Sequence, residues 1–397
     1  MNNLKCVHSY NGLRVANNGT VMPCCYYDEE SPLKDLNGNI IKTHTHSIKE
    51  MMESPDRISL IKDLESGIKH GACKRCWTDE TNKNTSKRIE DNERFDTDYN
   101  KSLKYIELNL GNTCNLACRM CNIGASIKWY DDHLEIYDDE GGFRKDKDGY
   151  KKFVKQFYKS FEDDSRFWEE FEKILPQISA FDIYGGEPML MKKQWEALEK
   201  SVELGYSKDQ ELHLATNGTI FAEKYFEILN KFKKCVVTFS LDAVGDRLEY
   251  IRHHANWNNI ETNVDKWINH PKNKNIEFDV AITVTNLNIY YLDEIVDWCI
   301  SKNLTPFLID VSRPEFYASY NLPQSAKNLI NKKFDIYLYK QELPSFILES
   351  IKGSLNNMNS KEYDMDLWFM FKKKNGILDS NRKQSFTNTF EELNSVI

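Results

Sequence analysis

Between residues 101 and 313, short apolar runs alternate with amphipathic segments, and this alternation is the strongest constraint on the fold. The apolar runs are rich in Val, Ile, Phe and Thr, which favour β-strands. The segments between them repeat apolar residues at helical spacing, as at residues 192–204, 223–232 and 289–302. Strand and helix units in series predict a parallel sheet with helices outside it, either curled like part of a barrel or doubly wound. The six runs are residues 105–110, 180–185, 212–217, 236–242, 278–284 and 306–311.

A first flanking region, residues 1–100, carries five of the chain's ten cysteines. Asn18 and Gly19 lie between two short apolar stretches, which predicts two strands joined by a tight turn. A helical pattern follows, with a cap at Ser47 and a stop at Gly67. We expect this region to form a small module of its own.

A second flanking region, residues 314–397, is mostly helical by pattern. Its aromatic segment at residues 366–371 predicts a helix packed against the sheet. A long charged insert between Cys121 and Ser179 interrupts the alternation of strands and helices. Its composition indicates either a solvated surface or a lid.

Of the 397 residues, 40% are hydrophobic and 12% are aromatic, which indicates a globular protein rather than a disordered one. The formal net charge is -8, with 53 Lys and Arg interspersed among 61 Asp and Glu, so a broad nucleic-acid surface is disfavoured. No apolar run approaches the roughly 20 residues of a membrane-spanning helix, and residues 1–10 lack the apolar stretch of a secretion signal. We therefore expect a soluble, cytoplasmic protein, in which clustered cysteines are metal ligands or redox groups rather than disulfides.

Three cysteines, Cys114, Cys118 and Cys121, follow the first strand run so closely that one loop can wrap all three around one object. Soft thiolates favour zinc or iron-sulfur clusters. A structural zinc ion takes four ligands, and no histidine lies in or just beyond this loop. A four-iron cluster held by three cysteines keeps one iron open for a ligand that is not protein.

The later strand runs also end in polar residues or glycines. Working residues of barrel enzymes lie at the carboxyl ends of the strands, so these positions are candidate ligand contacts. Two glycines allow the backbone to approach a ligand closely, and a following carboxylate can accept from an ammonium group. The positions are Gly185, Gly186, Glu187 and Pro188, then Thr216 and Asn217, then Ser240 and Asp242, and finally Thr285.

With Met120 directly before its last cysteine, the loop resembles the signature of the radical S-adenosylmethionine (radical SAM) superfamily. In that family the open iron of the [4Fe-4S] cluster chelates the amino and carboxylate groups of S-adenosylmethionine (SAM). The resemblance implies an α/β fold with a partial (β/α)6 TIM-like barrel at residues 101–313. A small α+β twitch module at residues 1–100 would precede the barrel, and a helical extension at residues 314–397 would follow it.

The resemblance also implies contacts with SAM. The element at residues 185–188 would contact the SAM amino group, Ser240 and Asp242 would lie near the ribose, and the strand that ends before Thr285 would lie near the adenine. Arg252 resembles a position that faces the SAM carboxylate, with a surface arginine on the following helix as the alternative. The full set implied to bind SAM is Met120, Gly185, Gly186, Glu187, Pro188, Thr216, Asn217, Ser240, Asp242, Arg252 and Thr285.

The cysteines of residues 1–100 resemble those of the twitch half of a SPASM module, which holds an auxiliary [4Fe-4S] cluster through four thiolates. Cys25 would be a spare thiol or an alternative ligand. A zinc site is the competing interpretation, because four thiolates in two pairs also suit zinc. Cys235 and Cys299 are interpreted as buried hydrophobic residues. The implied ligands are Cys6, Cys24, Cys73 and Cys76.

The function that the resemblance implies is reductive cleavage of SAM to a 5'-deoxyadenosyl radical, which abstracts hydrogen from a substrate. A reductant such as flavodoxin or ferredoxin would supply the electron. The auxiliary cluster suggests a ribosomally made peptide as substrate, with a small molecule such as a sugar or nucleotide as the alternative. A non-catalytic iron-sulfur electron carrier is the alternative from another class, but a carrier needs complete cysteine ligation and no SAM pocket. No catalytic proton donor or acceptor can be assigned.

Overall fold

The computed structural model describes residues 4–81, 85–95, 99–109, 111–137, 146–157 and 164–395. Six parallel strands follow one another across one sheet in chain order, so each connection returns on the same side and the sheet is not doubly wound. The edge strands do not pair with each other in the described residues, so the sheet stays open, as a partial barrel requires. The six strands are β3 (Tyr105–Asn109), β5 (Ala180–Tyr184), β6 (Glu211–Thr216), β7 (Lys234–Ser240), β9 (Ile276–Val284) and β10 (Thr305–Asp310).

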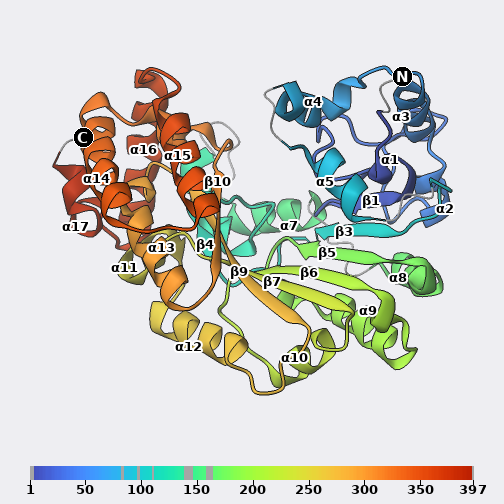
Figure 1. Cartoon of the computed structure of the whole chain (residues 1–397). Coiled ribbons are helices and arrows are strands. Elements are labelled where there is room, and N and C mark those ends of the chain that lie inside the picture. The colour runs from blue at the N-terminus through green and yellow to red at the C-terminus, as the bar shows by residue number, and fades with distance from the viewer. Residues whose placement is uncertain are drawn as a thin grey trace.

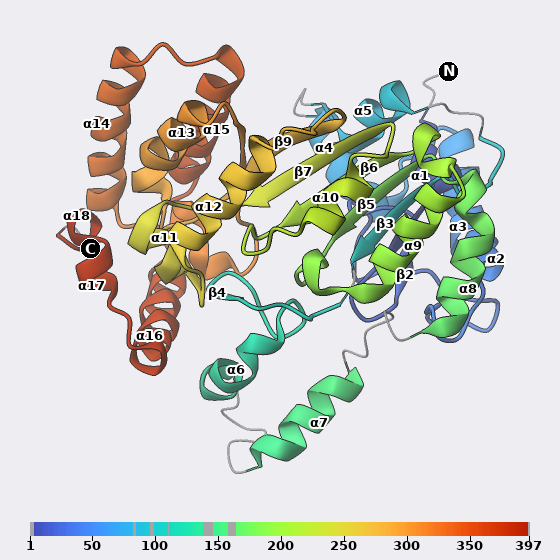
Figure 2. The ribbon, with the colours of Figure 1, turned by 90° about the horizontal axis from the view of Figure 1, so that it is seen from below.

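The two faces of this sheet differ in polarity, because successive side chains of a strand point to opposite faces. Figures 1 and 2 show helices α9 (Lys192–Glu203), α10 (Glu223–Leu229) and α12 (Trp257–Ile268) along one face. In β6 the buried residues are Leu212, Leu214 and Thr216, while the residues between them are only half-buried. The opposite face carries polar groups, including an ion pair between His213 Nδ1 and Asp182 Oδ1 at 2.7 Å.

The predicted N-terminal strand pair is present, and it extends the same sheet. Strand β1 (Gly12–Val15) pairs parallel to β3, and β2 (Val21–Met22) pairs antiparallel to β1 across the predicted turn. The single helical stretch predicted from Ser47 to Gly67 is instead two helices, α2 (Ile48–Met52) and α3 (Pro55–Glu65). The helix is interrupted there for two reasons. Ser54 caps the start of α3, and the first position of α3 is Pro55, which has no N–H to donate to the preceding turn.

A buried ion network joins the N-terminal module to the barrel sheet. Helices α1 (Val7–Asn11) and α5 (Lys87–Arg94) provide His8, Lys87 and Asp91, with His8 Nε2 at 2.6 Å from Asp91 Oδ2. Lys87 Nζ lies 3.0 Å from Asp91 Oδ2 and 3.2 Å from Glu107 Oε1 on β3. This network fixes the module against the polar face of the sheet. Helix α4 (Lys74–Thr81) completes the helices of the module.

The charged insert contains helices α6 (Tyr130–Tyr137), α7 (Lys147–Phe157) and α8 (Ser165–Ile174), while residues 138–145 and 158–163 lie outside the described residues. The C-terminal extension is helical, as expected, and lies at the opposite edge of the sheet from the N-terminal module (Figure 1). Its aromatic segment opens a helix whose Trp368 and Phe371 are buried. No helix in the described ranges is both long and apolar enough to cross a membrane. The C-terminal helices are α14 (Gln324–Lys340), α15 (Ser345–Asn359), α16 (Met365–Arg382), α17 (Phe386–Thr389) and α18 (Glu391–Asn394).

Candidate active site

A cavity of about 260 Å³ lies at the carboxyl ends of the parallel strands, where the cysteine loop meets them. All three loop cysteines line it, together with most of the residues that the sequence analysis assigned to SAM. The predicted residues among its lining are Cys114, Cys118, Met120, Cys121, Gly185, Gly186, Thr216, Asn217, Ser240 and Arg252. The sequence analysis missed Leu116, Ala125, Ser126, Tyr184, Ala215 and Thr283, which also line it.

Arg252 is brought to the cavity by a short antiparallel strand pair. Strand β4 (Ala117–Cys118) in the cysteine loop pairs with β8 (Arg252–His253), so that Cys118 lies opposite Arg252. Arg252 is 8% exposed, and its Nη1 lies 3.8 Å from Cys118 Sγ. Its Nε lies 2.7 Å from Oδ2 of Asp242. Burial lowers the pKa of Arg252, but Asp242, Cys118 and Cys121 together raise it above its usual value. The alternative of a surface arginine on the following helix is therefore wrong.

The cysteine loop has the features expected of a cluster-binding loop. Burial raises the pKa of Cys114 to about 11, so its thiolate needs a nearby positive charge such as a metal. The sulfur of Cys114 faces the N–H of Leu116 at 3.5 Å and the amide of Asn217 at 4.0 Å. Three thiols around one cavity, with N–H donors and a guanidinium beside them, fit a negatively charged cluster. No three His, Cys, Asp or Glu side chains in the described part of the chain already stand in a coordinating arrangement.

The two glycines after β5 are required by close packing, of Gly185 against Asn109 at the end of β3 and of Gly186 against the cysteine loop. Gly185 has φ +87° and Gly186 has φ +51°, values that favour glycine. A Cβ on Gly186 would lie only 2.5 Å from the carbonyl oxygen of Thr113. The next residue, Glu187, donates its backbone N–H to that same oxygen at 2.9 Å. The glycine turn and the cysteine loop are therefore in direct contact at the cavity wall.

Glu187 does not line the cavity, although the sequence analysis expected it to face the SAM amino group. Its side chain is buried and accepts hydrogen bonds from Thr216 Oγ1 at 2.7 Å, the Asn217 N–H at 2.8 Å and the Met189 N–H at 3.1 Å. Burial raises its pKa. Glu187 thus holds the end of β6, and with it Asn217, against the cysteine loop. Pro188, in the short 3-10 helix that follows, is buried away from the cavity lining.

Asp242 and Thr285 also lie behind the cavity wall. Asp242 is fully buried and accepts from the Thr283 N–H at 2.9 Å, besides pairing with Arg252. Thr285 donates hydrogen bonds from its backbone N–H and its hydroxyl to Asn288 Oδ1, at 2.7 and 3.1 Å. Thr283, two residues earlier and still within β9, lines the cavity instead. The strict alternation of strand side chains, continued across β7 and β9, is the signal that could have identified Thr283.

The N-terminal cysteines separate into a group of four and a single one. Cys6, Cys24 and Cys73 pack around one apolar cluster, and Cys76 is buried beside them. Burial raises the pKa of Cys6 to about 11 and of Cys73 to about 12. Burial and the carboxylate of Glu107 on β3 raise the pKa of Cys24 and of Cys25 alike.

Arg57 provides a second observation at the N-terminal cysteines. Its side chain is 1% exposed, and Nη1 donates to the carbonyl oxygens of His8 and Ser9. Among the described residues, its Nε and Nη2 atoms have no hydrogen-bond partner. Burial lowers the pKa of Arg57 to about 10, and the neighbouring Cys24 and Tyr27 act in the opposite direction. A buried cation with unused N–H groups beside these thiols fits a bound anionic metal-thiolate group.

Comparison with protein-family models agrees with this geometry. Residues 108–299 match the radical SAM superfamily, and residues 6–77 match SPASM, an iron-sulfur cluster-binding domain. The chain belongs to the radical SAM superfamily and carries its SPASM domain ahead of the barrel strands. No curated protein matches the chain.

Several solved structures resemble the chain distantly. Native anSMEcpe with bound AdoMet is 15% identical, with 60% of this chain and 62% of that chain covered and a TM-score of 0.37. SuiB of Streptococcus suis bound to S-adenosylmethionine is 14% identical, covers 84% of this chain and 69% of that chain, and has a TM-score of 0.36. The radical S-adenosylmethionine methyltransferase TsrM from Kitasatospora setae is 13% identical over 55% of this chain and 35% of that chain, with a TM-score of 0.36. The chain spans about three fifths of the length of anSMEcpe.

Proposed function

We propose that this protein is an enzyme that cleaves SAM reductively at the cavity beside its cysteine loop. The observation that carries the proposal is that Cys114, Cys118 and Cys121 line one cavity together with the carboxyl ends of the barrel strands. Three thiolates leave one iron of a [4Fe-4S] cluster free for SAM. With the cluster held by these cysteines, bound SAM would supply a 5'-deoxyadenosyl radical for hydrogen abstraction.

The residues around the cavity have distinct parts in this proposal. The three cysteines would hold the cluster, and Arg252 would face the carboxylate of SAM, for which its buried positive charge is suited. The glycine turn at Gly185 and Gly186 would place backbone groups near the amino group. Ser240, at the end of β7, would contact the ribose. Glu187 and Asp242 would act behind these residues by holding Asn217 and Arg252 in place.

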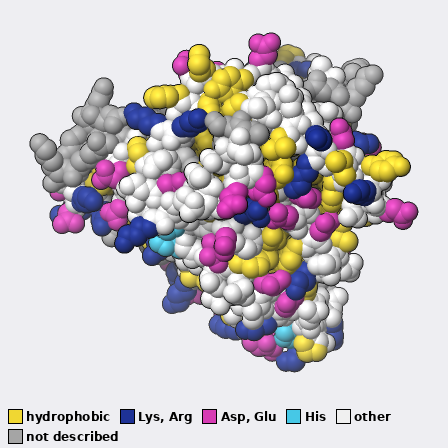
Figure 3. Space-filling view, turned by 90° about the vertical axis from the view of Figure 1, so that its left-hand side faces the viewer, with side chains coloured by type: hydrophobic (Ala, Val, Ile, Leu, Met, Phe, Trp, Pro, Cys, Tyr) yellow, Lys and Arg dark blue, Asp and Glu magenta, His cyan; other side chains and the backbone are white. Residues whose placement is uncertain are grey.

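We propose a peptide as substrate, bound along the polar face of the sheet next to the cavity. On edge strand β10, Phe307 and Ile309 are 49% and 53% exposed and lie on the same sheet face as Ser240 and Thr283. Apolar side chains beside a polar sheet face suit a peptide, which presents both kinds of group. A sugar or nucleotide is the second candidate substrate, because the same polar face could bind hydroxyl groups. In the view of Figure 3, acidic and basic side chains are interspersed, which disfavours a nucleic acid.

Formation of 5'-deoxyadenosine tests the proposed cleavage. The anaerobically reconstituted protein, supplied with SAM and dithionite in place of a flavodoxin or ferredoxin, should form 5'-deoxyadenosine, and Cys118→Ala should abolish it. Cys235→Ala is the matched control, because Cys235 is a fully buried thiol on β7 that does not line the cavity. Loss of product only in Cys118→Ala supports the proposal. A wild-type protein that binds iron but forms no product would instead be an electron carrier.

An auxiliary [4Fe-4S] cluster at Cys6, Cys24, Cys73 and Cys76 is the second part of the proposal. We expect about eight irons per chain, falling by about half when Cys73 and Cys76 are both replaced by alanine. Four irons and one zinc in the wild-type protein would show a zinc site instead. The substrate is tested with synthetic peptides encoded beside the gene. A mass change that requires SAM supports a peptide, and modification only of a sugar or nucleotide supports the second candidate.

A further inference from the structure

Arg119 lies between two of the loop cysteines and points away from the cavity. In the β4 to β8 pair, Cys118 faces the cavity, so the next side chain in the chain is directed to the opposite side. Arg119 is 1% exposed, and its guanidinium lies 3.6 Å from the ring centre of Tyr250. Burying a guanidinium is unfavourable unless each N–H has a partner. The partners of Arg119 therefore show what this side chain does.

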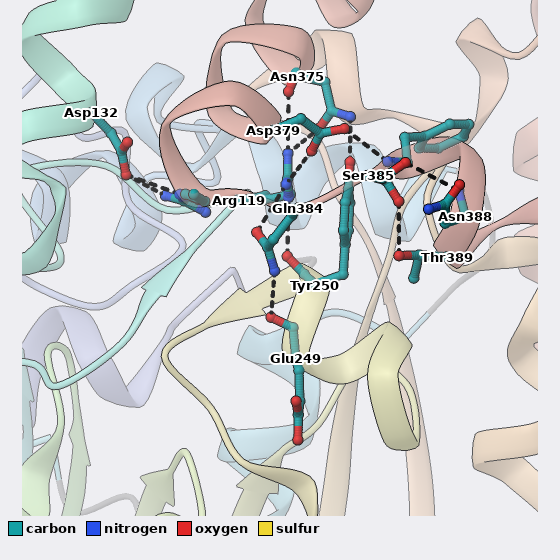
Figure 4. Close-up of polar contacts among 12 residues, drawn as sticks. Arg119, Asp132, Glu249, Tyr250, Asn375, Asp379, Gln384, Ser385, Asn388 and Thr389 are labelled. Carbon is teal, nitrogen blue, oxygen red and sulfur yellow. Dashed lines mark hydrogen bonds and ion pairs between the residues drawn. The ribbon is translucent and has the colours of Figure 1, made fainter.

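All five N–H groups of the guanidinium are used, and most of their partners belong to the C-terminal extension (Figure 4). Nε donates to the carbonyl oxygen of Tyr250 at 3.0 Å. Nη1 donates to Asn375 Oδ1 at 2.6 Å and faces its carbonyl oxygen at 3.5 Å. Nη2 donates to Asp379 Oδ1 at 2.6 Å and to Gln384 Oε1 at 3.0 Å. Helix α16 and the residues after it thus enclose a side chain of the cysteine loop.

The same residues of the extension also hold the end of helix α11 (Gly245–Ile251), which leads directly into β8. The Asn375 amide donates to the Tyr250 hydroxyl at 2.6 Å, and the Gln384 amide donates to the carbonyl oxygen of Glu249 at 3.1 Å. Arg252 follows Tyr250 by two positions and faces Cys118. Both strands of the β4 to β8 pair are therefore connected to α16.

A second ion pair joins α16 to the segment after the cysteine loop. Arg382 Nη2 lies 2.8 Å from Oδ2 of Asp132 on α6, and its guanidinium carbon lies 5.0 Å from the ring centre of Trp129. The Trp129 indole N–H donates to the carbonyl oxygen of Cys118 at 3.0 Å. The extension thus contacts the loop directly through Arg119 and reaches its backbone through Trp129.

We propose that Arg119 and Asp379 are positioning residues through which helix α16 sets the geometry of the cysteine loop and of Arg252. This role rests on the proposed function, because the geometry matters only where a cluster and SAM bind. Neither side chain lines the cavity. Asp379→Asn removes the charge that balances the buried guanidinium while keeping nearly the same shape. The unbalanced arginine would then loosen the loop and the strand pair on which Cys118 and Arg252 lie.

The test compares full-length wild type, Asp379→Asn and the matched control Asp366→Asn, which makes the same change at an exposed position of the same helix. All three proteins are reconstituted anaerobically. Amide hydrogen exchange is measured over residues 111–121, and the electron paramagnetic resonance of the reduced protein is recorded with and without SAM. In Asp379→Asn we expect exchange to be faster by about tenfold, the spectral change caused by SAM to be lost, and 5'-deoxyadenosine formation to fall by about tenfold. At least half of the iron, including the part held by the N-terminal cysteines, should remain.

Gln384→Ala is the second variant, because it removes a neutral partner of Arg119 and should fold if Asp379→Asn does not. We expect the same changes at about twofold to fivefold. The proposal is overturned if the folded variants of Asp379 and Gln384 match Asp366→Asn in hydrogen exchange and in the response to SAM. A wild-type protein that forms no 5'-deoxyadenosine would refute the proposed function instead. The exchange comparison would still decide whether α16 holds the loop, because exchange is measured without turnover.

Discussion

Replacement of Glu187 by glutamine tests whether this residue holds Asn217 in place or contacts SAM directly. Oε1 of Glu187 accepts from Thr216 and Met189, and Oε2 accepts from the N–H of Asn217. A glutamine has one oxygen and one NH2 group, so in either orientation its NH2 faces a buried backbone N–H, of Met189 or of Asn217. One hydrogen bond is lost and one buried donor is left unpaired, which costs about 1–3 kcal/mol of the free energy of unfolding. Burial of the carboxylate, which raises the pKa of Glu187, is itself unfavourable. The neutral glutamine removes this cost and so offsets part of the loss.

Urea unfolding followed by tryptophan fluorescence measures the stability change, and anaerobic equilibrium binding measures affinity for SAM. Glu196→Gln on α9 is the control, because Glu196 is a partly exposed carboxylate whose partners among the described residues are lysines of its own helix. This change should alter stability by less than about 0.5 kcal/mol. We expect Glu187→Gln to unfold at lower urea concentration and to bind SAM more weakly, because the position of Asn217 is lost. A variant with wild-type stability but weakened SAM binding would refute the idea that Glu187 holds Asn217 in place, and would favour direct contact between Glu187 and SAM.

Gly186→Ala should reduce 5'-deoxyadenosine formation by at least about tenfold and lower stability by about 1–3 kcal/mol, because the φ of Gly186 is +51° and the new Cβ would clash with the cysteine loop. The control is Gly376→Ala on α16, where no atom lies near the new Cβ, and its stability should be equal to that of wild type or slightly higher. Although burial alone would raise it, the histidine and lysine partners of Asp91 lower its pKa to about 2 from 3.8. This carboxylate therefore contributes about 2 kcal/mol to folding above pH 3.8 that is lost as the pH falls toward 2, and urea unfolding of Asp91→Asn should lack that part of the pH dependence. Iron analysis should show that Cys24→Ser loses about half of the iron while Cys25→Ser keeps it; the reverse result would make Cys25 the ligand.

The strands and the cysteine loop could be predicted because their signals are local. Alternation within 212–217 or 236–242 depends on neighbouring residues, and the spacing of Cys114, Cys118 and Cys121 keeps its meaning wherever the loop lies. The same holds for the turn at Gly19, where a short stretch defines the backbone conformation. The break before Pro55 was also present in the chain as a serine cap followed by proline, a signal that the helical period concealed.

Positions of individual side chains around the cavity depended on contacts between distant segments. Thr283 and Thr285 are equally polar and two positions apart, so alternation alone would direct both to one face. Because β9 ends at Val284, Thr285 instead bonds Asn288, and Thr283 lines the cavity. Arg252 could not be distinguished from a surface arginine until β8 paired with β4. Glu187 has the same carboxylate whether it meets a ligand or a backbone N–H, and the packing of β6 decides which.

The chemical character of the protein, a thiolate loop at the end of a parallel sheet strand, follows from residues that are close in the chain. The attachment of that loop to helix α16 does not follow from nearby residues. Arg119 and Asp379 are separated by 260 positions, and no local sequence pattern predicts that they meet. Short-range periodicity specifies which segments form strands and helices, since backbone hydrogen bonding is local or repetitive. Which buried charges meet is decided only when the segments pack, since pairing of a desolvated arginine depends on every acceptor that the folded chain brings around it.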